Sequence, residues 1–73
     1  MIDVKIFATL RDGREKGYKL PAEDFHTALD IMKYLSIEPD EVAILLINGF
    51  HAKPEDAVKD EDMVSLFPPC AGG

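Results

Sequence analysis

The chain has 73 residues, a net charge of −6 and one cysteine. This length suits a single domain, the acidic balance argues against a general nucleic-acid binder, and one cysteine cannot form an internal disulfide. No apolar run approaches the roughly 20 residues needed to span a bilayer, and the N-terminus lacks the features of a signal peptide. We therefore expect one domain over residues 1–73, located in the cytoplasm, with no nucleic-acid or membrane partner.

The charge is distributed unevenly along the chain. Residues 1–20 carry five basic and three acidic side chains, whereas residues 21–73 carry three basic and eleven acidic ones. Acidic surfaces commonly serve solubility. The alternative is electrostatic steering toward a basic partner surface.

The first 21 residues predict two antiparallel strands joined by a polar loop. In IDVKIFA, Ile2, Val4 and Ile6 alternate with Asp3, Lys5 and Phe7, which is strand periodicity with the β-branched residues on the buried side. LRDGREKG has the composition of a hairpin loop. YKLP is the expected second strand.

The segment DFHTALDIMKYLSI predicts the main helix, because its apolar residues follow the three-to-four spacing of a helix. Thr27 is a candidate N-cap with Asp30 three residues later, and Asp24 is the alternative cap. Pro39 disfavours helical geometry at Glu38, so the helix is expected to end before it.

The remaining segments complete the predicted fold. VAILLI before Asn48-Gly49 indicates a central strand that ends in a tight turn, FHA begins the return strand, and KPEDAV suggests a short helical turn with Pro54 in its first position. KDEDMVSLF supplies a polar turn and the last strand. The order β-β-α-β-β-β predicts an α+β fold of the β-grasp (ubiquitin-like) type, a mixed sheet of four to five strands with one main helix, and the alternative is another small α+β fold.

One helix covers only one face of such a sheet. Phe7 points away from the buried side of the first strand, and Met63 and Phe67 share the outward phase of the last strand. We expect an apolar patch around Phe7 and Phe67 on the helix-free face, extended by Phe50. Such patches often mark partner surfaces, although scattered surface aromatics are also normal.

Residues 68–73 are expected to form an extended, flexible C-terminal tail. Pro68 and Pro69 favour an extended backbone, and Gly72 and Gly73 have no side chains, so they fit a narrow channel. The functional group would be the α-carboxylate of Gly73, which is a poor electrophile until its oxygen becomes a leaving group.

The same residues resemble a known family. FPPCAGG is similar to the C-terminus of MoaD, the small-subunit family of molybdopterin synthase, where FPPVAGG is usual, and KIFATLRD, INGFHA and VKDEDMVSLF resemble other parts of that family. The related ThiS carriers share the fold and the diglycine but typically lack the Phe-Pro-Pro run. The likeness covers nearly the whole chain, and its motifs are most specific at the two ends.

The resemblance implies a sulfur carrier that is not itself an enzyme and binds no cofactor. A ubiquitin-activating-type (MoeB-like) enzyme would use ATP to adenylate Gly73, and sulfur would then replace the adenylate to give a thiocarboxylate. The tail would enter the large subunit (MoaE-like) and deliver sulfur to a pterin whose dithiolene later holds molybdenum or tungsten. Gly73 and Gly72 would be the reactive end, and the partner-binding residues would be Phe7, Arg11, Phe50, Phe67, Pro68, Pro69, Cys70 and Ala71.

Several alternatives stay open. Arg11 is either a partner contact or a solvated loop residue. Cys70 stands where valine is common, and it is either a small apolar substitute or a thiol able to join sulfur exchange. The rival functions are a carrier for another pathway, such as thiamine or an amino acid, and a ubiquitin-like modifier that forms isopeptide bonds from Gly73. His26, His51 and Cys70 are too few and too scattered to predict a metal site.

Overall fold

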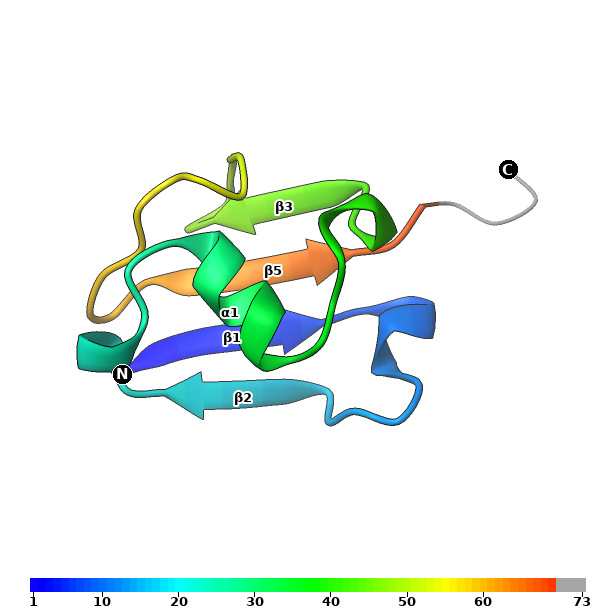
Figure 1. The fold of residues 1–73 in the computed structure, drawn as a ribbon, viewed down its shortest axis with the longest axis horizontal. Coiled ribbons are helices and arrows are strands. Elements are labelled where there is room, and N and C mark those ends of the chain that lie inside the picture. The colour runs from blue at the N-terminus through cyan, green and yellow to red at the C-terminus, as the bar shows by residue number, and fades with distance from the viewer. Residues whose placement is uncertain (70–73) are drawn as a thin grey trace.

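Five strands form one mixed sheet in the order β2-β1-β5-β3-β4 (Figure 1). The strands are β1 (Ile2–Ile6), β2 (Gly17–Leu20), β3 (Ile44–Ile47), β4 (Phe50–His51) and β5 (Met63–Phe67). β1 runs parallel to β5 and antiparallel to β2, and β3 runs antiparallel to both β5 and β4. The computed structural model describes residues 1–69. It confirms the predicted element order and the α+β β-grasp class.

The centre of the sheet differs from the prediction. β5 lies in the middle, and β3, predicted as the central strand, is next to the two-residue edge strand β4. β3 is apolar in both phases because one of its faces packs on the core and the other contributes to an apolar surface. An all-apolar strand therefore does not identify the central position in this sheet.

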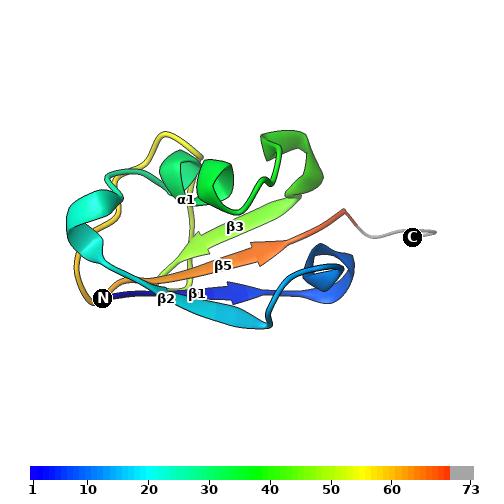
Figure 2. The same cartoon turned by 60° about the horizontal axis from the view of Figure 1, so that its bottom comes forward.

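The core lies between the sheet and helix α1 (Ala28–Tyr34), which covers one face (Figures 1 and 2). The predicted inward residues Ile2, Val4 and Ile6 of β1 are at most 1% exposed. Val64 and Leu66 of β5 are fully buried beside them, as are Ala28, Ile31 and Met32 of α1. Two strands and one helix thus supply most of the dry interior.

Helix α1 begins as predicted and ends earlier than predicted. The Thr27 hydroxyl accepts from the Asp30 N–H at 3.3 Å, and the Asp30 carboxylate accepts from the Thr27 N–H at 3.1 Å, which forms a capping box. The alternative cap is wrong, because Asp24 belongs to a separate 3-10 turn, η2 (Ala22–Asp24). The helix ends at Tyr34, well before the residue that Pro39 constrains.

A Schellman motif ends the helix. The Ile37 N–H donates to the Met32 carbonyl at 2.8 Å, the Ser36 N–H donates to the Lys33 carbonyl at 3.1 Å, and Ser36 has φ of +58°. Ile37 is buried, so the chain turns back onto the core at once. A serine occupies the left-handed position, where glycine is usual, and the sequence pattern therefore did not mark this end.

Arg14 fixes the β1–β2 loop against the same helix end. Its guanidinium donates to the carbonyls of Leu10, Leu35 and Ser36, each at 3.0 Å. The predicted hairpin loop is accordingly structured, with a 3-10 helix η1 (Ala8–Arg11) at its start. These bonds satisfy carbonyls that a helix end and a loop would otherwise leave to water.

The Asn48-Gly49 turn is confirmed, with φ of +54° and +85° at its two residues. The Asn48 amide nitrogen donates to the Asp62 carboxylate at 2.8 Å, and its oxygen accepts from the Met63 N–H at 2.9 Å. The other oxygen of the buried Asp62 accepts from the Lys59 N–H at 2.9 Å. The turn is thereby locked to the loop that enters β5.

The segment after β4 was predicted to form a short helical turn. KPEDAV forms a turn without a helix, so that prediction is wrong; the Asp56 carboxylate accepts from the Lys53 N–H at 2.8 Å, which closes the turn locally.

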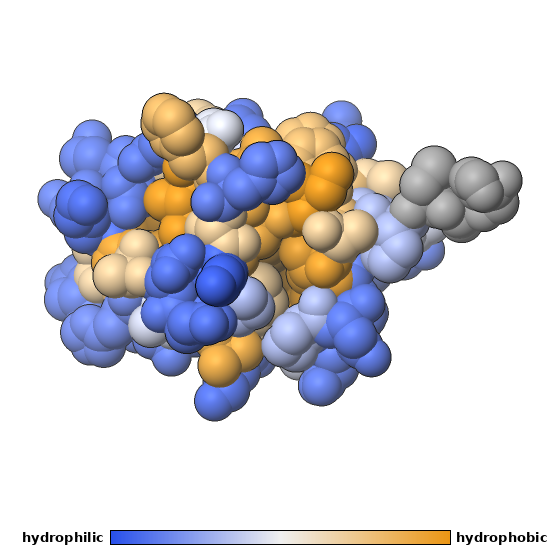
Figure 3. All heavy atoms as spheres, turned by 90° about the horizontal axis from the view of Figure 1, so that it is seen from above, coloured by the Kyte–Doolittle hydropathy of each residue, from blue (hydrophilic) through white to orange (hydrophobic). Residues whose placement is uncertain are grey.

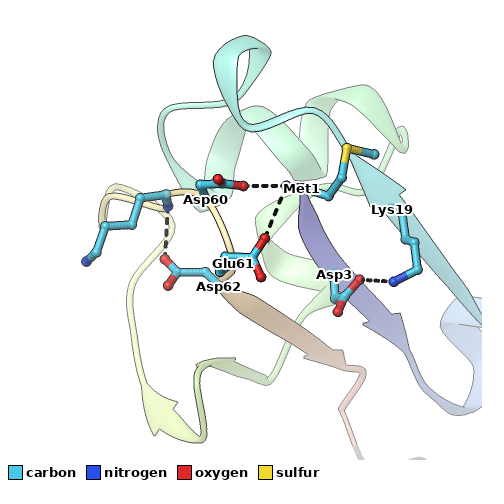
Figure 4. Close-up of polar contacts among 7 residues, drawn as sticks. Met1, Asp3, Lys19, Asp60, Glu61 and Asp62 are labelled. Atoms are coloured by element: carbon cyan, nitrogen blue, oxygen red, sulfur yellow. Dashed lines mark hydrogen bonds and ion pairs between the residues drawn. The ribbon is translucent and has the colours of Figure 1, made fainter.

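The α-amine of Met1 contacts the carboxylates of Asp60 and Glu61 (Figure 4). Within residues 1–69, no helix has the length and apolar character required to cross a membrane.

Candidate functional site

The helix-free side of the sheet carries an apolar face, defined as Phe7, Ile44, Leu46, Met63 and Phe67. The register places these residues together, because Ile44 lies opposite Phe67 and Leu46 opposite Ser65, while Phe7 follows β1 next to the end of β5. Ile44 and Met63 are 42% and 40% exposed, and the other three are partly buried. The sheet therefore presents apolar side chains to solvent on the side that α1 leaves uncovered.

Phe7 and Phe67 form the centre of this face. Their rings stack with centroids 4.2 Å apart and an interplanar angle of 6°. Stacking shields one side of each ring and leaves both rings partly exposed. The predicted patch around these two residues is present, and Ile44 and Leu46 belong to it as well; the two-phase apolar pattern of VAILLI was the sequence signal for them.

Arg11 lies at the rim of the apolar face. Its guanidinium carbon is 5.6 Å from the Phe7 ring centroid, and its Nε donates to the Ile6 carbonyl at 2.7 Å. Arg11 thus holds η1 against the end of β1 and contacts the aromatic pair. Its role toward a partner stays a prediction.

Phe50 does not extend the apolar face as expected. It pairs with Ile47, and paired residues point to the same side of a sheet. Ile47 packs against the core, so Phe50 lies on the helix side, at the sheet edge and 77% exposed. Figure 3 shows the molecule from the side of this sheet edge, and apolar side chains gather across the middle of the surface seen in that view.

The tail leaves from the centre of the sheet, directly after the aromatic pair. Pro68 follows Phe67, the last residue of β5, and is partly buried, and Pro69 is exposed. The predicted reactive and partner-binding residues Cys70, Ala71, Gly72 and Gly73 lie outside the described residues. Pro68 thus continues the chain from the end of β5, beside the apolar face, because Phe67 is the last residue of that strand.

The backbone just after Phe7 has an unusual conformation. Ala8 has φ of +53°, a left-handed geometry that costs a non-glycine residue roughly 1–2 kcal/mol. The Phe7 N–H donates to the Leu66 carbonyl at 3.1 Å, and the Phe7 carbonyl accepts from Leu10 at 3.2 Å. The chain thus changes direction at Ala8, between the end of β1 and η1, immediately after the residue that stacks on Phe67.

Within residues 1–69, no group of three or more His, Cys, Asp or Glu side chains could hold a metal ion. In the same part of the chain, every buried side-chain nitrogen or oxygen has a hydrogen-bond partner. His51 lies opposite Leu46, and the His26 backbone N–H donates to the Asp30 carboxylate at 2.8 Å. The two histidines thus lie on separate elements, one beside the N-terminus of α1 and the other on β4.

Comparisons with known proteins give the following findings. The ThiS family model matches residues 4–73. No curated protein matches the chain. Among solved structures, small archaeal modifier protein 1 (SAMP1) from Haloferax volcanii has a TM-score of 0.75 at 24% identity, over 99% of this chain and 98% of that one.

Two further structures are similar in fold. A chain of the BexX/CysO complex from Amycolatopsis orientalis has a TM-score of 0.73 at 22% identity, over 100% of both chains. A chain of the complex of subunits 1 and 2 of the molybdopterin-converting factor from Helicobacter pylori has a TM-score of 0.64 at 20% identity, over 99% of this chain and 97% of that one. At these identities the likeness is one of fold.

Proposed function

Because the chain belongs to the ThiS family, of the ThiS/MoaD type, we propose that it is a sulfur carrier that holds sulfur as a thiocarboxylate on Gly73. We propose further that it delivers this sulfur as the small subunit of molybdopterin synthase, in the synthesis of a molybdenum or tungsten cofactor. The observation that carries the proposal is the placement of the FPPCAGG segment: it starts at the end of the central strand, beside an exposed apolar face.

The chemistry follows from the inertness of a carboxylate. A Gly73 carboxylate oxygen attacks the α-phosphorus of ATP on a separate, MoeB-like adenylating enzyme, which gives the acyl adenylate and pyrophosphate. The terminal sulfur of a persulfide then attacks the acyl carbon and AMP leaves. A thiol reduces the resulting acyl disulfide, releasing the thiocarboxylate and a new disulfide.

In this proposal the chain contributes the shape of the tail and the surface that docks the partner. Pro68 and Pro69 fix φ near −65° and favour an extended start to the tail, and Gly72 and Gly73 add no side chain that would block a narrow channel. The apolar face, with the Phe7–Phe67 stack at its centre, would dock the partner that receives the tail. In this proposal a MoaE-like large subunit performs the sulfur transfer.

The proposal is tested by mass spectrometry. The chain is incubated with an adenylating enzyme, ATP and a persulfide donor, and the expected product has one oxygen of Gly73 replaced by sulfur. A variant with one alanine added after Gly73 is the control, and it should stay unmodified. If a known carrier is modified in the same mixture while this chain keeps only its carboxylate, the proposal fails.

The acceptor is tested separately. The thiocarboxylate form, mixed with a molybdopterin synthase large subunit and the pterin precursor, should lose its sulfur as dithiolene forms. Retention of the thiocarboxylate in that mixture, with discharge in a thiamine or amino-acid pathway, would favour a carrier of another pathway. A Cys70→Val variant that discharges normally would show that the Cys70 thiol takes no part in the exchange.

The fold similarity to small archaeal modifier protein 1 supports a second candidate, a ubiquitin-like modifier. The same acyl adenylate would then be attacked by a lysine amine of a target protein, with AMP as leaving group and an isopeptide bond as product. A tagged chain expressed in cells should give larger, thiol-resistant species that disappear when Gly73 is deleted. Their absence would leave sulfur transfer as the function.

A further inference from the structure

A hollow lies between β1 and β2 on the helix-free side of the sheet. Its volume is about 330 Å³, and its walls include Lys5, Lys16, Lys19 and Met63. Gly17 forms part of the floor, where a Cβ atom would lie 2.8 Å from the Val4 carbonyl oxygen. The close approach of the two strands thus requires glycine here, and the missing side chain leaves the hollow open.

The hollow is basic in an acidic protein. Its three lysines are exposed, whereas the chain as a whole has a net charge of −6. Asp3 is the one acidic residue in the wall, and its carboxylate accepts from the Lys19 ammonium at 2.8 Å (Figure 4). Among residues 1–69, Lys5 and Lys16 have no ion pair within 4 Å, so their charges are available to an anionic group.

The Asp3–Lys19 pair stabilises the charged form of both partners. The hydrogen bond from Lys19 lowers the pKa of Asp3, and the same bond raises the pKa of Lys19. Glu61 adds a weaker charge interaction with Lys19. Lys19 is therefore partly neutralised, and the surplus positive charge belongs to Lys5 and Lys16.

The hollow is continuous with the apolar face. Met63 belongs to both, and Lys5 lies opposite Ser65, between Met63 and Phe67 on the neighbouring strand. The length of β5 from Phe67 to Met63 is roughly 13 Å at 3.3 Å per residue. A partner surface that covers the apolar face at the tail exit therefore reaches the hollow without a gap.

We propose that the basic hollow receives carboxylate side chains of the enzyme that adenylates Gly73, so that one interface joins an apolar half to an ionic half. This inference rests on the proposed function. We choose the adenylating enzyme as the partner because the Gly73 carboxylate must be adenylated before sulfur can be transferred to an acceptor of any pathway. Complementary charge chiefly raises the rate of encounter and fixes orientation.

The competing explanation is that the lysines only protect the sheet edge. β2 is an edge strand that carries Lys19 and directly follows Lys16, whereas Lys5 lies on the inner strand β1; exposed lysines on edge strands discourage pairing with other sheets. That role needs no contact with a partner. It predicts that the lysines stay equally reactive in the complex.

The chain offers a matched control, because it has three lysines in the hollow and three elsewhere, at Lys33, Lys53 and Lys59. All six are exposed. The first variant replaces the hollow lysines by glutamine (Lys5→Gln, Lys16→Gln, Lys19→Gln), and the control variant replaces the other three in the same way. Both variants lose the same charge, and neither removes a buried side chain.

The assay is the rate of thiocarboxylate formation at limiting carrier concentration, followed by mass spectrometry. The hollow variant should lose about tenfold or more in kcat/KM at low ionic strength, and the control variant should match the unaltered chain. Near 1 M salt, where the Debye length is about 3 Å, the difference should vanish. Equal rates for the two variants would overturn the inference while leaving the proposed function intact, whereas an unaltered chain that is never modified would refute the function itself.

Reductive methylation of the unaltered chain gives an independent readout. In the complex with the adenylating enzyme, the hollow lysines should be protected and the other three should react as in the free chain. Uniform reactivity, or protection of Lys33, Lys53 and Lys59 instead, would contradict the proposed interface.

Discussion

Replacement of Phe7 and Phe67 by alanine should separate folding from docking. Both rings are partly exposed and stacked at 4.2 Å. Full burial of a phenylalanine side chain is worth about 1.5–3 kcal/mol, so each half-buried ring should contribute about 1 kcal/mol to the free energy of unfolding. A stacked pair adds roughly 0.5–1.5 kcal/mol beyond burial. The double variant should therefore lose about 3 kcal/mol, less than the 5–15 kcal/mol of a typical domain.

Binding should respond more strongly than stability. Aromatic residues at the centre of an interface commonly cost about 2 kcal/mol or more each when truncated, which corresponds to a loss of roughly thirtyfold in affinity. Urea denaturation followed by circular dichroism gives the stability of the single and double variants. Calorimetric titration with the adenylating enzyme gives their affinity.

Phe50→Ala is the matched control, because Phe50 is 77% exposed and lies on the other side of the sheet. It should change both quantities by less than about 0.5 kcal/mol. Unfolding of the double variant would mean that the two rings are part of the core. A loss of affinity in Phe50→Ala equal to that of the double variant would place the docking surface on a different face.

Three further predictions concern the frame that holds this surface. Ser36→Gly should raise the free energy of unfolding by up to about 1 kcal/mol in urea denaturation, because Ser36 has φ of +58°; a decrease would contradict the cap described above. Asn48→Gly keeps the turn geometry but removes the amide bonded to the buried Asp62, and it should lower the free energy of unfolding by about 1–3 kcal/mol in the same assay. An unchanged denaturation midpoint would show that the Asn48–Asp62 hydrogen bond does not stabilise the turn. Backbone hydrogen bonds from His26 and Thr27 lower the pKa of Asp30 in the folded chain below its ordinary 3.8. The charged Asp30 carboxylate therefore stabilises the fold above pH 3.8, and this contribution is lost as the pH falls through the lowered pKa of the folded state. Asp30→Asn should flatten the acid limb of a pH–stability curve, and an identical limb would rule out the capping carboxylate as its source.

Local chemistry made much of the fold predictable. A capping box and a left-handed turn depend on side chains that are close in sequence. The structure around Thr27 and Asp30, and that of the Asn48-Gly49 turn, could therefore be predicted from a few residues each. The alternation of the first strand likewise fixed which residues enter the core. The apolar patch around Phe7 and Phe67 was predicted from two outward strand phases and one uncovered face, whereas the stacking of the two rings is known only from the structure.

Several of the features that escaped prediction depend on contacts distant in sequence. The position of β3 beside the edge is set by pairing with β5, which no local pattern contains. Arg14 reaches the helix end across more than 20 residues, so its sequence neighbours showed only a polar loop. The basic hollow arises where Gly17 meets Val4, and lysines from separate segments gather around it only after the strands pair.

The location of β5 has a mechanical consequence. It is bonded along its length to β1 on one side and to β3 on the other. Tension applied to the chain beyond Phe67, as when a partner draws the tail inward, acts along the strand and must shear both ladders together rather than peel off an edge. The end that would carry the sulfur is therefore attached to a strand that is paired on both sides, so that pulling on this end loads two strand pairings at once.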